Sequence, residues 1–182
     1  MRIPLILASL CLSVSCLSAT ASLAQPPQNI SQKYNALKGQ LNNAPDSERL
    51  REVTKFWNQN HDPVSHTEAW GRGEDSDFRP KIGDVLSVHG GKTKATLDKR
   101  SLALVKCESL LDVGVESDRL AFGDAVDASG QSQIVILYDE PFGELLVLTP
   151  DAGNAVSLTN SGLALARQAY SCATLQVKEI EQ

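Results

Sequence analysis

Hydrophobic positions between residues 30 and 57 recur at the three- and four-residue spacing of an α-helix. The pattern predicts two helices. The first is expected over residues 30–41 and ends at the Asn-Asn-Ala-Pro run of residues 42–45. The second is expected to start with Asp46 or Ser47 as its N-cap, and Glu48 suits its positive end. The two apolar stripes consist of Ile30, Tyr34, Leu37, Leu41, Leu50, Val53, Phe56 and Trp57.

A polar stretch and then a long central helix follow. Residues 59–79 are rich in turn formers and predict irregular structure, with a short helix over residues 82–88. Asp98 is a good N-cap for a helix that runs through Val113, and Gly114 is a natural stop. The buried side of this helix is expected to hold Leu102, Val105, Ser109 and Leu110.

Beyond Gly114 the hydrophobic period changes from helical to two. Residues 120–122, 134–138 and 145–148 read as strands, the last two joined by a hairpin loop over residues 139–143. Residues 156–158 and 173–177 are expected to add edge strands. Helices followed by strands predict an α+β fold, with N-terminal helices and a central helix packed on an antiparallel sheet.

The N-terminus has the pattern of a secretory signal peptide. A basic start and an apolar run from Leu5 to Leu17 precede small residues, which predicts a signal peptide over residues 1–24, cut after Ala24. A lipoprotein signal at Cys16 is the alternative, although Ser13 stands where that signal has leucine. Residues 25–29 would be a flexible lead and residues 30–182 one domain. The processed chain is expected to be periplasmic or secreted, with no membrane insertion.

The cysteines and the net charge are consistent with an exported protein. Two of the four cysteines, Cys107 and Cys172, lie beyond the signal peptide, and an oxidising compartment favours a disulfide between them. Such a bond contributes about 4 kcal/mol in the chain-entropy model. The chain carries 17 basic and 22 acidic residues, a net charge of −5, which opposes nucleic-acid binding.

Several segments between Tyr34 and Pro150 resemble, in order and spacing, the bacterial transglutaminase-like cysteine peptidases, which include the periplasmic LapG-type adhesin proteases. In that family a Cys begins the central helix, where the helix terminus favours thiolate, and a His and an Asp lie on the following strands. The resemblance implies a papain- or transglutaminase-like core. The matching segments are residues 52–58, the Trp-Gly pair at 70–71, residues 98–120, residues 133–137 and residues 146–149.

All three catalytic positions depart from the family pattern. The family has Gly-Asp-Cys-Glu-Asp where residues 97–101 are Leu-Asp-Lys-Arg-Ser, so Lys99 stands at the nucleophile position. Gln133 stands at the histidine and Thr149 at the aspartate. The acidic pair that the LapG-type branch ties to calcium is replaced by Arg100 and Ser101. The resemblance therefore implies a member without the Cys-His-Asp triad, and neither metal nor cofactor is expected.

The other reactive residues are expected to have structural rather than catalytic roles. Cys107 lies about 12 Å along the helix from Lys99 and is expected to be a buried thiol or half of the disulfide. Lys99 and Ser101 are poorly placed to act as a dyad. The histidines at 61, 66 and 89 are expected at the surface, and the acidic residues at 74, 75 and 77 are expected to form a solvated turn rather than a weak calcium site.

Three functional hypotheses follow. In the first, the chain is a catalytically inactive family member that binds a protein partner, either an adhesin segment or an inner-membrane receptor, in biofilm and adhesion control. The alternatives are an active hydrolase with rearranged chemistry at Cys107, Lys99 or Ser101, and an accessory structural domain with no retained groove.

Overall fold

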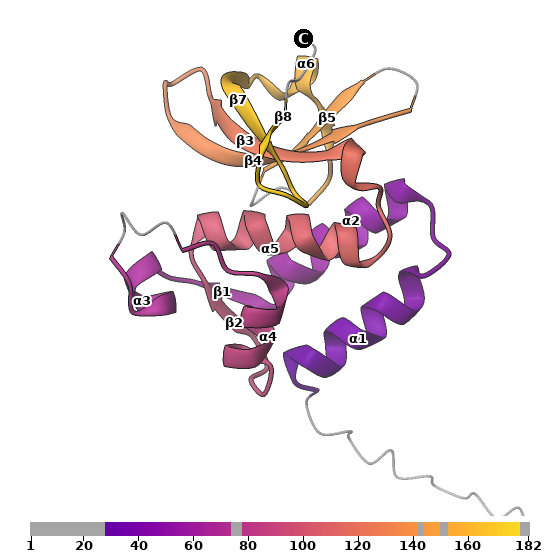
Figure 1. Ribbon diagram of the computed structural model, residues 1–182, viewed down its shortest axis with the longest axis vertical. Coiled ribbons are helices and arrows are strands. Elements are labelled where there is room, and N and C mark those ends of the chain that lie inside the picture. Colours follow the sequence, from indigo (N-terminus) through magenta and orange to yellow (C-terminus); the bar gives the residue numbers. More distant parts are fainter. Residues whose placement is uncertain (1–27, 74–77, 142–143, 150–152, 179–182) are drawn as a thin grey trace, which may run out of the picture.

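The computed structural model describes residues 28–73, 78–141, 144–149 and 153–178, apart from the side chains at 166 and 167. The helices of residues 30–112 gather on one side of a curved sheet, and the central helix, α5 (Lys99–Asp112), lies directly against it (Figure 1). The predicted fold class, α+β with an antiparallel sheet, is confirmed.

The first two helices match the hydrophobic pattern. Helix α1 (Ile30–Leu41) begins with a capping box between Asn29 and Gln32, and helix α2 (Asp46–Gln59) packs beside it. The predicted side-chain cap of α2 is wrong, because its N-cap is Pro45, which makes no side-chain hydrogen bond. The Asp46 carboxylate bonds instead to Arg49, one turn along the same helix, and to Arg119 and Tyr138 on distant segments.

The segment expected to be irregular contains short elements. Strand β1 (His61–Pro63) pairs in parallel with β2 (Ala95–Leu97). Between them lie α3 (His66–Trp70) and α4 (Ile82–His89). Ser65 and Glu68 form a capping box for α3, a local signal that the sequence contains. The strands are too short to show a periodicity, so only their pairing defines them.

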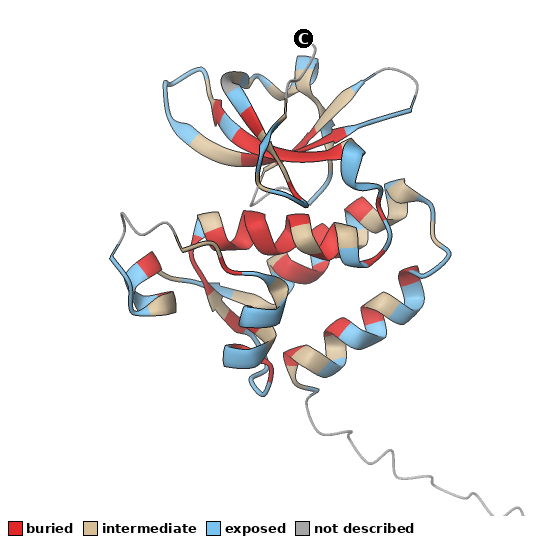
Figure 2. Cartoon of the chain, viewed as in Figure 1, coloured by how far each residue is buried: buried red, intermediate tan, exposed pale blue. Residues whose placement is uncertain are grey.

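Helix α5 (Lys99–Asp112) is the centre of the molecule. Asp98 caps it as predicted by accepting a hydrogen bond from the Ser101 backbone N–H at 3.0 Å. Burial extends well beyond the predicted side and includes every residue from Ser101 to Cys107 (Figure 2). The helix is enclosed because α2 packs on one side and the sheet on the other. Gly114, at φ +94°, ends it in a conformation that favours glycine.

The sheet follows the short 3₁₀ helix η1 (Ser117–Arg119) and has the strand order β6-β5-β4-β3-β7-β8, antiparallel throughout. Strand β7 (Ala164–Ser171) was not predicted, because its alanines and polar residues are poor strand formers. The predicted edge strand over residues 173–177 is largely a turn that leads into β8. The remaining elements are β3 (Leu120–Val126), β4 (Ser132–Asp139), β5 (Leu145–Leu148), β6 (Val156–Ser157), α6 (Leu158–Ser161) and β8 (Val177–Lys178).

Both faces of the sheet are covered. Phe122, Ile136 and Tyr138 face the helices and belong to the main core. Val135 and Leu137 point the other way, into a second cluster that Leu158 of α6 helps to cover. This alternation is the two-residue period that the sequence showed. The sheet is thereby held rigidly over α5.

A disulfide between Cys107 and Cys172 ties α5 to the end of β7, closing a sequence separation of 65 residues with a Cα–Cα distance of 5.7 Å. Both cysteines are buried. Among the described residues, no helix has the length and apolar character needed to cross a membrane.

Candidate functional site

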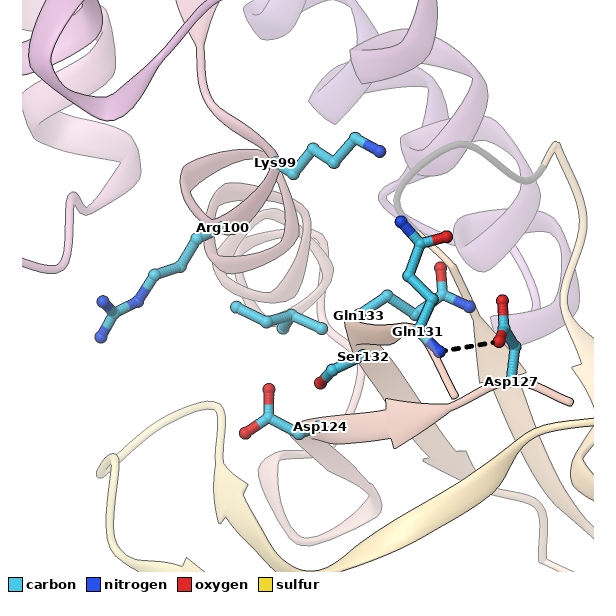
Figure 3. Close-up of a pocket in the computed structure, with 8 residues that line it drawn as sticks. Lys99, Arg100, Asp124, Asp127, Gln131, Ser132 and Gln133 are labelled. Carbon is cyan, nitrogen blue, oxygen red and sulfur yellow. Dashed lines mark hydrogen bonds between the residues drawn. The ribbon is translucent and has the colours of Figure 1, made fainter. Parts of the chain in front are cut away.

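A cavity of about 340 Å³ opens at the N-terminus of α5. Its helical side carries Lys99 and Arg100, and the opposite side is the hairpin that joins β3 and β4 (Figure 3). The hairpin is stiffened from within, because the Asp127 carboxylate accepts hydrogen bonds from the backbone N–H groups of Ser129 and Gln131. The lining residues are Lys99, Arg100, Asp124, Asp127, Gln131, Ser132, Gln133 and Ile134.

Two of the three positions singled out from the sequence meet at this cavity. Lys99, at the start of α5, and Gln133, on β4, both line it. Thr149 follows directly after β5 and is not among the described lining residues. Leu148 pairs with Ile136, which places Thr149 alongside β4 beyond that pair. Lysine and glutamine thus line one cavity, at the positions that the family resemblance assigns to the nucleophile and the base.

The start of α5 is held by four side chains, here called the Asp98 cluster: the buried His66, Asp98 and Ser101 and the partly buried Trp70. One Asp98 oxygen lies 3.0 Å from His66 Nδ1 and accepts the Ser101 hydroxyl proton at 2.5 Å. Trp70 Nε1 donates to Ser101 Oγ at 2.9 Å. Burial acts to raise the pKa of Asp98, but the hydrogen bonds from Ser101 and His66 outweigh it and leave that pKa lowered.

Two of the three alternative catalytic residues on α5, Cys107 and Ser101, lack the surroundings that hydrolysis needs. Cys107 is buried and bonded to Cys172, so its thiol is consumed. Ser101 is 0 % exposed and donates its proton to Asp98 rather than to an imidazole. His66 Nδ1 bonds to the same Asp98 oxygen, so the carboxylate rather than the imidazole is the partner of the Ser101 hydroxyl.

The expectation of surface histidines is wrong for two of the three. His66 and His89 are buried, whereas His61 is partly exposed and bonds through Nδ1 to the Trp57 carbonyl. His89 packs 5.9 Å from the Trp70 ring, and neither of its nitrogens has a partner among the described residues. Burial, followed by the charge of Lys92, lowers its pKa. The sequence missed this because α3 and α4 meet only in the tertiary structure.

The fold, a six-stranded antiparallel sheet over a central helix, is similar to that of solved structures of Legionella pneumophila LapG. It superposes on Legionella pneumophila LapG with a TM-score of 0.55, 22% identity and coverage of 79% of this chain and 77% of that one. The calcium-bound form of that protein superposes with a TM-score of 0.59 and 22% identity, covering 85% of this chain and 84% of that one. The EGTA-treated form superposes with a TM-score of 0.58 and 21% identity, covering 85% of this chain and 80% of that one. At these identities the likeness shows a shared fold. No protein-family model and no curated protein matches the chain.

The residues at the start of α5 do not suit a calcium ion. Calcium takes six to eight oxygen ligands. Here Arg100 contributes a positive charge. The side-chain oxygens of Asp98 and Ser101 are already hydrogen-bonded to one another, to His66 and to Trp70. No group of three or more His, Cys, Asp or Glu side chains in the described part of the chain could hold a metal. Residues 74, 75 and 77 of the acidic turn lie outside the described residues.

Most cavity residues could not be found from the sequence. Asp124 and Ile134 face each other across β3 and β4, and their pairing alone brings them to the cavity. Gln131 and Ser132 carry no motif in the sequence that would single them out. The only usable signal was the family resemblance, which pointed to Lys99, Arg100 and Gln133.

Proposed function

We propose that the chain is an exported, catalytically inactive relative of the LapG-type proteases that binds an extended segment of a protein partner. The partner classes that the family resemblance suggests are a surface adhesin and an inner-membrane receptor, and the role would be control of adhesion and biofilm formation. Binding would use the cavity at the N-terminus of α5, which persists although its chemistry has changed.

One observation carries the proposal. The cavity is open to solvent and lined by Lys99 and Gln133 at the positions of nucleophile and base, and its described lining includes neither cysteine nor histidine. Covalent peptide hydrolysis needs an activated nucleophile within hydrogen-bond reach of a base. A groove kept without those groups still offers polar contacts and apolar surface to a polypeptide.

Export is supported separately. Residues 1–24 have the composition of a signal peptide, and the disulfide between Cys107 and Cys172 is typical of an oxidising compartment. The excess of acidic residues disfavours nucleic acid as the partner. These points favour a partner met outside the cytoplasm.

Site-specific photo-crosslinking tests the proposal. A photoreactive phenylalanine analogue is placed at Gln133, in the cavity, and separately at the exposed Gln59 of α2 as a matched control. In the cells that make the protein, irradiation is expected to join a second polypeptide to the Gln133 variant and not to the Gln59 variant. Mass spectrometry of the adduct identifies the partner.

A turnover assay on the purified protein complements the crosslinking. Mixed fluorogenic peptides are expected to show no hydrolysis above that of the Lys99→Ala variant. Hydrolysis that Lys99→Ala or Ser101→Ala abolishes would instead establish the rearranged hydrolase. Equal crosslinking from both positions would remove the cavity as the binding site.

A further inference from the structure

A second cavity, of about 350 Å³, adjoins the one at the start of α5 and shares Arg100, Asp124 and Ile134 with it. Strands β3, β4 and β7 contribute to its lining, as do α5 and Arg79, which precedes α4. A segment bound in the first cavity reaches the second within a few residues, because an extended chain advances about 3.3 Å per residue. We call the second cavity the aromatic cavity, after the two rings that line it.

The two rings belong to Phe122 and Tyr170, which pair across β3 and β7. Their centroids are 5.6 Å apart and their planes are 28° from parallel, so the rings are stacked. Phe122 is buried in the main core, whereas Tyr170 is only partly buried. The Arg79 guanidinium lies 5.8 Å from the centre of the Tyr170 ring. The pair therefore presents aromatic surface to the cavity, and a third ring can pack against such surface edge-on or offset.

Asp124 supplies a hydrogen-bond acceptor beside the rings. It follows Phe122 by two residues on β3, so both side chains lie on the same face of the sheet. Asp124 is exposed, and its carboxylate makes no hydrogen bond or ion pair with the residues that the structure describes. The carboxylate is therefore available to accept a hydrogen bond from a ligand.

The mixed charges of the lining favour a neutral ligand group. A cation would face the guanidinium groups of Arg79 and Arg100, and an anion would face the Asp124 carboxylate. A neutral ring with a hydrogen-bond donor at its edge suits both the rings and the acceptor. A cavity of about 150 Å³ holds a benzene molecule, so 350 Å³ has room for a phenol or indole ring.

We propose that the aromatic cavity takes a tyrosine or tryptophan side chain of the partner segment. The ring packs against Phe122 and Tyr170, and the phenol O–H or indole N–H donates to the Asp124 carboxylate. This inference rests on the proposed function and adds the kind of residue that the partner contributes. Tyrosine and tryptophan are the side chains that combine a large ring with such a donor, and they are frequent anchors at protein interfaces.

NMR titration with defined peptides tests the proposal. The probe is an uncharged heptapeptide of glycine and serine with a central tyrosine, acetylated and amidated at its ends, and it is added to the ¹⁵N-labelled, full-length processed protein. The largest shifts are expected at the backbone amides of Phe122, Gly123 and Tyr170. Replacing the probe tyrosine by phenylalanine should weaken binding about fivefold, because the donor is lost. Replacing it by leucine should weaken binding about tenfold, because the ring contacts are lost as well.

A protein variant separates the hydrogen bond from the ring contact. Asp124→Ala should weaken binding of the tyrosine probe about fivefold and leave the Kd of the phenylalanine probe unchanged, so that the two probes bind alike. The matched control Asp139→Ala removes an exposed carboxylate from the far end of the neighbouring strand β4 and should change neither Kd. Both carboxylates are exposed, so both variants are expected to fold, which unchanged thermal midpoints would establish.

Several results would overturn the aromatic contact. They are equal binding of the three probes, a tyrosine preference that Asp124→Ala leaves intact, and largest shifts outside the aromatic cavity. Absence of any shift at about 5 mM peptide, where even millimolar affinity is detected, also overturns it.

The failure of the aromatic contact and the failure of the proposed function are distinguishable. Loss of crosslinking at Gln133 overturns the proposed function, whatever the probes do. Where crosslinking succeeds, the joined segment is expected to contain a tyrosine or tryptophan within about five residues of the crosslink. A joined segment without either residue overturns the aromatic contact only.

Discussion

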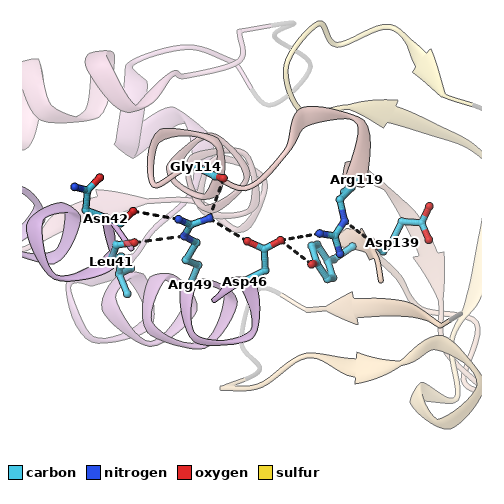
Figure 4. Close-up of polar contacts among 8 residues, drawn as sticks. Leu41, Asn42, Asp46, Arg49, Gly114, Arg119 and Asp139 are labelled. Atoms are coloured by element: carbon cyan, nitrogen blue, oxygen red, sulfur yellow. Dashed lines mark hydrogen bonds and ion pairs between the residues drawn. The ribbon is translucent and has the colours of Figure 1, made fainter. Parts of the chain in front are cut away.

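Two carboxylates hold this molecule together in different ways. Asp46 bonds to Arg49 at 3.1 Å, to Arg119 at 2.8 Å and to the Tyr138 hydroxyl at 2.9 Å (Figure 4). These four residues are the Asp46 cluster, and they join α2 to η1 and β4 across the seam between helices and sheet. Asp98 bonds only to neutral groups on its own helix and to His66.

The difference lies in what each carboxylate leaves behind when it is removed. Removing Asp46 leaves Arg49 and Arg119 without their carboxylate partner. Arg119 already has a buried nitrogen without a hydrogen-bond partner among the described residues. Arg49 also donates to the carbonyls of Leu41 and Gly114, so the contacts across the seam depend on where the Arg49 guanidinium is held. Loss of Asp98 leaves a hydroxyl, an N–H and an imidazole. The site end of α5 therefore tolerates change better than the seam.

The largest effect is expected from Asp46→Ala, which should lower the free energy of unfolding by about 3 kcal/mol because it leaves low-exposure arginines unpaired. Urea denaturation measures the change. The control Asp62→Ala breaks an exposed ion pair with Lys94 and should cost less than about 1 kcal/mol. Equal costs for the two variants would contradict the role of the seam.

Asp98→Ala should destabilise the protein by about 2 kcal/mol, since it removes an N-cap and the partner of Ser101 and His66. Asp98→Asn keeps an accepting oxygen and should cost about half as much. The lowered pKa of Asp98 implies stability that is present above about pH 4 and lost as pH falls through the folded pKa. Urea midpoints between pH 5 and 3 should therefore vary less in the asparagine variant.

The smallest expected effect concerns His89, which is buried against Trp70 of the Asp98 cluster and whose ring nitrogens have no hydrogen-bond partner within the described part of the chain. Its lowered pKa means that the unfolded chain takes up the proton first, so stability falls as pH decreases from about 6.5. His89→Phe should reduce this fall by about 1 kcal/mol between pH 7 and 5.5. The control His61→Phe should retain it, and equal pH profiles in thermal melts would contradict the assignment.

Local signals in the sequence predicted α1, α2, α4 and α5 and four of the strands, β3, β4, β5 and the edge strand β6, whereas α3 and α6 were not predicted. Asp98 and Gly114 mark the two ends of α5 through hydrogen bonds and dihedrals set within a few residues. The period-two segments became β3, β4 and β5, although β3 and β4 extend beyond the predicted ranges. Strand β7 carries no such pattern and is defined by its pairing with β3, so only the tertiary structure revealed it.

The sequence by itself determined that no cysteine stands at the start of α5, because residue identity needs no geometry. It also indicated the fold class, through a hydrophobic period that switches from helical to two. Only the tertiary structure decided that His66 and His89 are buried, that Asp46 spans the seam and that Lys99 and Gln133 line one cavity. Each of these depends on side chains from segments far apart in the chain, whose approach is decided by packing rather than by neighbours in sequence.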